Sequence, residues 1–156
     1  MTTDKKLIPN GTITPNVLYD FVFPYLFEGE LKCLLYICRR TYGFHKERDR
    51  ISLSQFVCGI RSHDGNKLDG GAGISRPTAI EALKILSESG LVNKIKTPKG
   101  DMYGINLDCG IDSDKSNKII QKIRWLRDLT RTGKAALPRQ VKLFNPQKKG
   151  KLVNKI

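Results

Sequence analysis

The chain has 156 residues, enough for one domain with a hydrophobic core and an extension. It carries 28 Lys and Arg against 15 Asp and Glu, a formal net charge of +13, which favours a polyanionic partner: nucleic acid or an anionic membrane surface. No run of about 18 apolar residues is present to span a membrane, and the N-terminus lacks the apolar stretch of a signal peptide. We therefore expect a cytoplasmic protein that is not embedded in a membrane.

The side chains that usually carry catalysis or bind metals form no recognisable motif. The cysteines have no zinc-site or redox spacing and are expected to be reduced, and the histidines have no evident ligand or catalytic partner. These residues are Cys33, Cys38, Cys58, Cys109, His45 and His63. The glycine-rich stretch 70–73 lacks the preceding strand and the spacing of a nucleotide-binding fingerprint. The sequence therefore predicts a protein that is not an enzyme and that needs no metal or cofactor.

The N-terminal part of the chain predicts two helices. Thr14 and Pro15 have the pattern of an N-cap followed by a proline in the first helical turn, and Pro24 should end or bend this helix. A stronger helix is expected over residues 28–41, with Gly43 as its stop. Its expected apolar stripe consists of Leu31, Leu34, Leu35 and Cys38.

The next segment predicts a short strand, a short helix and a loop. Residues 45–50 are exposed and highly charged, and Ile51 follows as a brief strand. Ser52 and Gln55 form a capping box for a short amphipathic helix. Residues 61–73 are rich in Gly, Asp and Asn and predict a flexible loop.

A further helix and a β-hairpin complete the order of elements. Ser75 caps this helix and Gly90 ends it. Its buried face is expected to hold Ala79, Leu83 and Leu86, flanked by Ile80 and Ala82. Residues 91–96 and 102–107 predict the two strands of a hairpin around the turn 98–101. The order is that of a winged helix-turn-helix, so the fold class is mostly α with a small β-hairpin.

Positive charge is concentrated in the C-terminal part of the chain. Residues 112–156 carry 13 basic and 3 acidic side chains, against 15 and 12 in residues 1–111. Apolar side chains at helical spacing predict an amphipathic helix over 112–131. Residues 132–156 lack such periodicity and predict a basic, disordered tail. The expected organisation is an arm over 1–13, a DNA-binding domain over 14–111, this helix and this tail.

The helix that begins at Ser75 is the expected reading helix. In a helix-turn-helix, the N-terminal end of the second helix enters the major groove of duplex DNA. The residues expected to contact DNA there are Ser75, Arg76, Pro77, Thr78, Glu81 and Lys84. Arg76 can form hydrogen bonds to guanine or to a phosphate. Glu81 can accept a hydrogen bond from cytosine N4 and so determine the sequence preference. In the alternative interpretation, Ser75 is only a cap and Arg76 only a solvated side chain.

Contacts to the DNA backbone are expected from cations of the hairpin and of the charged stretch before the first strand. These cations are Lys94, Lys96, Lys99, Lys46, Arg48 and Arg50. Removal of any one phosphate-binding cation should weaken binding uniformly and reduce the log-salt slope by about 0.9. The alternative is that the hairpin lysines are ordinary solvated surface residues.

The segment Leu31–Phe56 resembles the N-terminal domain of the bacteriophage lambda-type replication protein O family. That family shows a helix of the form F-K-V-L-L-x-I-x-R-K-T-Y-G-W followed by D-R-I-[ST]-x-S-Q-L. The matching residues here are Leu31 to Leu35, Arg39 to Phe44 and Asp49 to Phe56. The resemblance extends over about residues 8–107. It implies binding to origin duplex DNA at replication initiation, usually as dimers on repeated sites, in a phage or prophage.

Three features depart from that family. The loop 61–73 is long, Glu81 stands where relatives often have a basic residue, and only a short basic helix and tail follow the domain. Family members can carry a C-terminal region that recruits the replicative helicase, so helicase recruitment is not expected here. Two alternative functions are a transcriptional regulator with the same domain and a protein-interaction module. In the module, the helix over 115–130 forms a dimer or partner surface anchored by Trp125, rather than packing back onto the domain.

Overall fold

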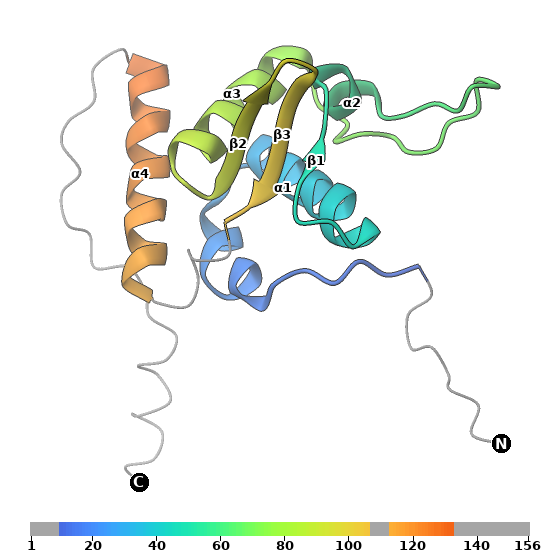
Figure 1. Ribbon diagram of the computed structural model, residues 1–156. Coiled ribbons are helices and arrows are strands. Elements are labelled where there is room, and N and C mark those ends of the chain that lie inside the picture. The colour runs from blue at the N-terminus through green and yellow to red at the C-terminus, as the bar shows by residue number, and fades with distance from the viewer. Residues whose placement is uncertain (1–9, 107–112, 133–156) are drawn as a thin grey trace, which may run out of the picture.

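The computed structural model of the protein describes residues 10–106 and 113–132. In chain order its elements are η1 (Leu18–Val22), η2 (Phe23–Tyr25), α1 (Glu28–Thr41), η3 (Tyr42–Phe44), β1 (Asp49–Arg50), α2 (Leu53–Cys58), α3 (Arg76–Glu88), β2 (Val92–Thr97), β3 (Gly100–Ile105) and α4 (Ser113–Thr132) (Figure 1). The strands form one antiparallel sheet in the order β1-β3-β2. This is the predicted winged helix-turn-helix, with the β2–β3 hairpin as its wing. Most of the expected arm and of the expected tail lies outside the described residues.

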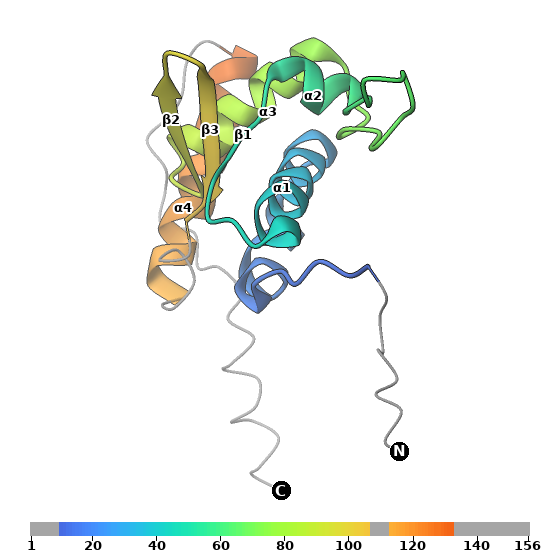
Figure 2. The ribbon, with the colours of Figure 1, turned by 45° about the vertical axis from the view of Figure 1, so that its right-hand side comes forward.

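The sheet, α1, α2 and α3 enclose a common hydrophobic core. The two views show the sheet on one side of α1 and α3, with α4 next to α3 (Figures 1 and 2). Phe56 of α2 is fully buried, and its ring meets those of Tyr36 in α1 and Tyr103 in β3 edge to face, each at 5.4 Å between centroids. These ring contacts join the wing to both helices beneath it.

The first helix differs from the prediction. Thr14 does not cap it; the Thr14 hydroxyl instead lies 2.7 Å from the Tyr19 hydroxyl. Leu18–Val22 form a π-helical turn that buries Leu18 and Val22, and a 3-10 turn containing Pro24 follows. Pro24 therefore ends this helical segment, as expected.

α1 has the predicted bounds, but its buried side is rotated from the predicted stripe. Leu34 is buried as expected, whereas Leu35 is 39% exposed and Ile37 is fully buried. The reason is that α1 packs against both α3 and β3, so its buried arc is set by these two neighbours. The chain also continues through Gly43 as a 3-10 turn and stops at His45, which adopts a left-handed φ of 56°.

The segment between α2 and α3 is a loop, but its base is tightly bonded rather than flexible. The Asp69 carboxylate accepts hydrogen bonds from the Tyr36 hydroxyl at 3.0 Å, from the Ile60 N–H at 3.2 Å and from the Gly71 N–H at 2.9 Å. Beyond this base, residues 61–67 form a small hairpin that projects from the body of the molecule (Figures 1 and 2). Asp69 thus holds the two ends of the loop, and with them the entry to α3, against α1.

α4 packs back onto the domain. Ile123 and Leu126 belong to the same hydrophobic core as α1 and α3, and Ile120 is also buried. Arg127 forms an ion pair with Glu30 of α1, and both side chains are nearly buried. No helix among the described residues is long and apolar enough to cross a membrane.

Candidate nucleic-acid interface

α3 starts at a well-formed cap. The Ser75 hydroxyl oxygen accepts from the Thr78 N–H at 3.4 Å and lies 2.7 Å from the Thr78 hydroxyl. Ser75 is therefore a structural cap, as both interpretations of the sequence expect. Arg76 and Pro77 follow in the first turn and are exposed. Within residues 10–106 and 113–132, Arg76 has no ion-pair partner, so its guanidinium is free for an external ligand.

The outward face of α3 has two distinct sides. Pro77 and Lys84 lie about 20° apart around the helix axis, at the centre of this face. Ile80 lies on the side that faces the wing, and Glu81 lies on the side that faces α4. The sequence predicts that Ile80 flanks the core, but it is 51% exposed. The core contacts of α3 are made by residues on the other side of the helix, such as Leu86, and they leave Ile80 uncovered.

An open groove of about 610 Å³ separates α3 from the wing. Its floor is apolar and contains Ile51 and Tyr103, which are almost fully buried. Its charged lining has three lysines, Lys84 on α3 and Lys94 and Lys96 on β2, against the two acidic residues Glu88 and Asp101. Lys94 and Lys96 share this face of the strand because side chains alternate along it. We call this feature the wing groove.

The lysines of the wing are not equivalent. Lys94 forms an ion pair with Asp101 at 3.2 Å, and its ammonium lies 5.8 Å from the centroid of the Tyr103 ring. Burial by itself lowers the pKa of Lys94, but the interactions with Tyr103 and Asp101 outweigh burial and raise it. Lys96 and Lys99, in contrast, have no ion-pair partner among the described residues. The charge that the wing offers to a ligand thus comes from Lys96 and Lys99.

The other three expected backbone contacts do not join the wing groove. Lys46 lies 3.4 Å from Asp49 in an ion pair. Arg50 pairs with Met102 across the sheet, on the face opposite to the groove. Arg48 lies on that same opposite face, where its side chain packs over Gly104 of β3. The structure therefore brings α3 together with Lys94 and Lys96, and it places these three cations elsewhere.

Two hydrogen-bonded pairs that the sequence did not reveal position the interface. Arg40 of α1 donates to Asp49 from Nε at 3.0 Å and from Nη2 at 2.7 Å, which fixes β1 on the helix. Tyr36 donates to Asp69 and fixes the entry to α3. Burial, and then the hydrogen bond to Asp69, raise the pKa of Tyr36. Both pairs join residues from different elements, so no local pattern in the sequence signals them.

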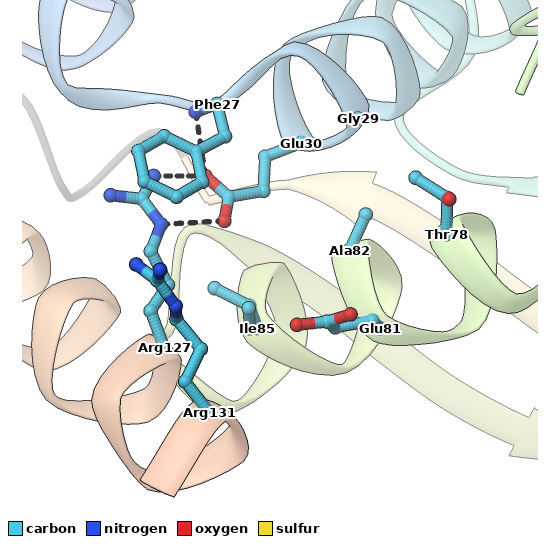
Figure 3. Close-up of a pocket in the computed structure, with 9 residues that line it drawn as sticks. All are labelled: Phe27, Gly29, Glu30, Thr78, Glu81, Ala82, Ile85, Arg127 and Arg131. Carbon is cyan, nitrogen blue, oxygen red and sulfur yellow. Dashed lines mark hydrogen bonds and ion pairs between the residues drawn. The ribbon is translucent and has the colours of Figure 1, made fainter.

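A small pocket of about 130 Å³ lies on the other side of α3, between α1, α3 and α4. Glu81 and Arg131 reach toward it from α3 and α4, next to the Glu30–Arg127 ion pair (Figure 3). Arg127 is already paired with Glu30, and Glu81 forms no ion pair within residues 10–106 and 113–132.

Thr78 contributes to this pocket through its methyl group. A Cβ built on Gly29 of α1 would lie only 2.7 Å from Thr78 Cγ2, so the two helices cross in close contact at this point. The hydroxyl of Thr78 is engaged with Ser75 and its methyl group with α1. Both ends of the Thr78 side chain therefore make contacts within the fold.

The described part of the chain holds no evident metal site. Within residues 10–106 and 113–132, no three His, Cys, Asp or Glu side chains are grouped so as to hold a metal ion. No protein-family model matches the chain, and neither a curated protein nor a solved structure shows significant similarity to it. The fold assignment therefore rests on the order of the elements and on the strand register alone.

Proposed function

We propose that the chain is a sequence-specific duplex DNA-binding protein. The observation that carries this proposal is the wing groove: an exposed helix face beside Lys84 and Lys96, with Lys99 in the turn of the wing. None of these three lysines has an ion-pair partner in the described part of the chain. An α-helix fits the major groove of duplex DNA, and the flanking phosphates then lie beside it, where the lysines can neutralise them. Arg76, at the first turn of α3, supplies a bidentate donor for guanine or phosphate.

We further propose that the recognised DNA is a replication origin of a phage or prophage, bound in the cytoplasm. The support is the resemblance of residues 31–56 to lambda-type replication protein O. These residues form α1, η3, β1 and α2, the scaffold that carries α3. A transcriptional regulator with the same scaffold would make the same contacts, so the location of the sites separates the two functions.

Selection of binding sites from a random duplex library by the full-length chain tests the proposal. We expect one enriched motif, which occurs as clustered repeats at an origin; single sites over promoters would instead identify a regulator. Arg76→Ala should relax the preference at one position of the motif, at a cost of about 1–3 kcal/mol for the preferred base. Arg48→Ala, on the opposite face of the sheet, is the matched control and should retain the motif. Failure to enrich any motif would overturn the proposal.

A further inference from the structure

We infer that Ile80 is a specificity-determining residue that contacts the C5-methyl group of a thymine in the major groove. This inference rests on the proposed function, because it needs α3 to lie in the major groove. It adds what the wing groove selects: a T·A pair at a defined position of the site, recognised by an apolar contact.

The first support is the location of Ile80. It is 51% exposed on α3, while its neighbours Ala79 and Leu83 are 0% and 5% exposed. It lines the wing groove together with Lys84, one turn further along the helix, and with Lys96 on the facing strand. A DNA backbone held by these two cations brings base edges over the part of α3 that carries Ile80.

The second support is the chemistry of the ligand. Single exposed apolar side chains are common on protein surfaces and need no explanation. Ile80, however, lies beside Lys84 on the face of α3 that lines the wing groove, where the proposed function places DNA. Most groups on the base edges in the major groove are donors and acceptors, and the methyl group of thymine is the largest apolar group there. An isoleucine matches that methyl group best, because a donor or acceptor facing it would lose its hydrogen bonds to water.

The third support is stiffness. Isoleucine is branched at Cβ and holds one strongly preferred χ1 rotamer in a helix. Its terminal methyl groups are therefore placed before DNA binds, and binding costs little side-chain entropy. Burial of one methyl group against such a surface should change affinity on the order of fivefold.

A thermodynamic cycle between protein and DNA tests the inference. Each thymine of the selected site is replaced in turn by deoxyuridine, which removes only the C5-methyl group, and binding is measured by fluorescence anisotropy. We expect one of these replacements to weaken binding of the wild-type protein to the DNA about fivefold. Ile80→Ala should bind the thymine site about fivefold more weakly and should bind both DNAs equally. Ile80→Val, which keeps the branch and removes one methyl group, should retain part of the discrimination.

Leu129→Ala provides the matched control. Leu129 is 38% exposed on α4, away from the wing groove, and its truncation should leave the deoxyuridine penalty intact. Thermal unfolding of each variant confirms that it is folded.

Three results would overturn the inference. A specific site whose thymines can all be replaced without weaker binding contradicts it and leaves the proposed function intact. A deoxyuridine penalty of equal size in wild type and Ile80→Ala assigns the methyl group to another residue. If no motif is enriched, the proposed function fails and the inference fails with it.

Discussion

Arg127 of α4 and Glu30 of α1 form a buried ion pair between residues 97 positions apart in the chain. Arg127 Nε donates to Glu30 Oε1 at 2.7 Å, Nη2 reaches the other carboxylate oxygen, and Nη2 also donates to the Tyr25 carbonyl at 2.8 Å. The guanidinium lies 3.7 Å from the centroid of the Phe27 ring. Because Glu30 also accepts the Phe27 N–H at the start of α1, one carboxylate caps α1 and fixes α4.

Replacement of Arg127 by Met should destabilise the fold strongly. It leaves the Glu30 carboxylate buried without its charge partner, and we expect the free energy of unfolding in urea to fall by about 3 kcal/mol. Emission of Trp125, which is partly buried against the core, should shift to the red if α4 detaches. Lys32→Met is the control: it breaks the exposed Lys32–Glu28 pair and should not change stability measurably. Equal stability of the two variants would contradict a structural role for the buried pair.

Two glycines of the α2–α3 loop should respond differently to substitution by alanine. Gly71 and Gly73 both have positive φ, 68° and 65°. A Cβ at Gly71 would lie 2.6 Å from the Gln55 carbonyl oxygen, whereas a Cβ at Gly73 meets nothing within 4 Å. Gly73→Ala should therefore cost only backbone strain, about 1 kcal/mol, and Gly71→Ala should cost that plus a clash, about 3 kcal/mol or more. Chemical unfolding measures the free energy of unfolding of both variants. An equal loss of stability in the two would show that the backbone at the base of the loop shifts to accommodate the added methyl group.

Lys96 and Lys94 should contribute unequally to DNA binding. Lys96→Ala removes a charge with no ion-pair partner among the described residues, so it should weaken binding to all duplexes and reduce the log-salt slope by about 0.9. Lys94→Ala removes a charge already paired with Asp101, so the slope should change less. Anisotropy titrations over a series of salt concentrations give both slopes. A larger change for Lys94 would show that DNA displaces Asp101 from Lys94 and that the ion pair does not withhold this charge.

The described cysteines should differ in reactivity. Burial, and then the charge of Glu30, raise the pKa of Cys33 to about 12, and burial raises the pKa of Cys38 to about 12. Both remain protonated and shielded at pH 8 and at pH 10, whereas Cys58 is exposed. Iodoacetamide should thus label Cys58 in the native protein, and Cys33 and Cys38 only after unfolding. Peptide mass spectrometry resolves the sites; rapid native labelling of Cys33 would indicate that α1 opens.

Local signals in the sequence predict much of the fold. The bounds of α1 and the capping box at Ser52 and Gln55 are confirmed. So are the Ser75 cap and the end of α3 before Gly90, which has a φ of 86°. Each depends on residues within a few positions of one another, and their chemistry acts before any tertiary contact forms.

Features that depend on which elements meet were not predictable. Leu35 and Ile80 are exposed because neighbouring elements cover other arcs of α1 and α3, and hydropathy alone does not identify these arcs. The pairs of Asp69 with Tyr36 and of Glu30 with Arg127 join residues 33 and 97 positions apart. The charge pattern does not distinguish Lys96 from Lys94, and the register of β2 and β3 places Asp101 directly opposite Lys96; only the side-chain positions show that Asp101 pairs diagonally with Lys94.

The closed base of the α2–α3 loop makes the hairpin above it a natural insertion point. Asp69 holds Ile60 and Gly71 together, so the path of the chain between them does not determine where α3 begins. Exposed loop tips of this kind tolerate inserted sequence best. A fluorophore or an affinity tag placed between His63 and Gly65 would therefore leave α3 in position.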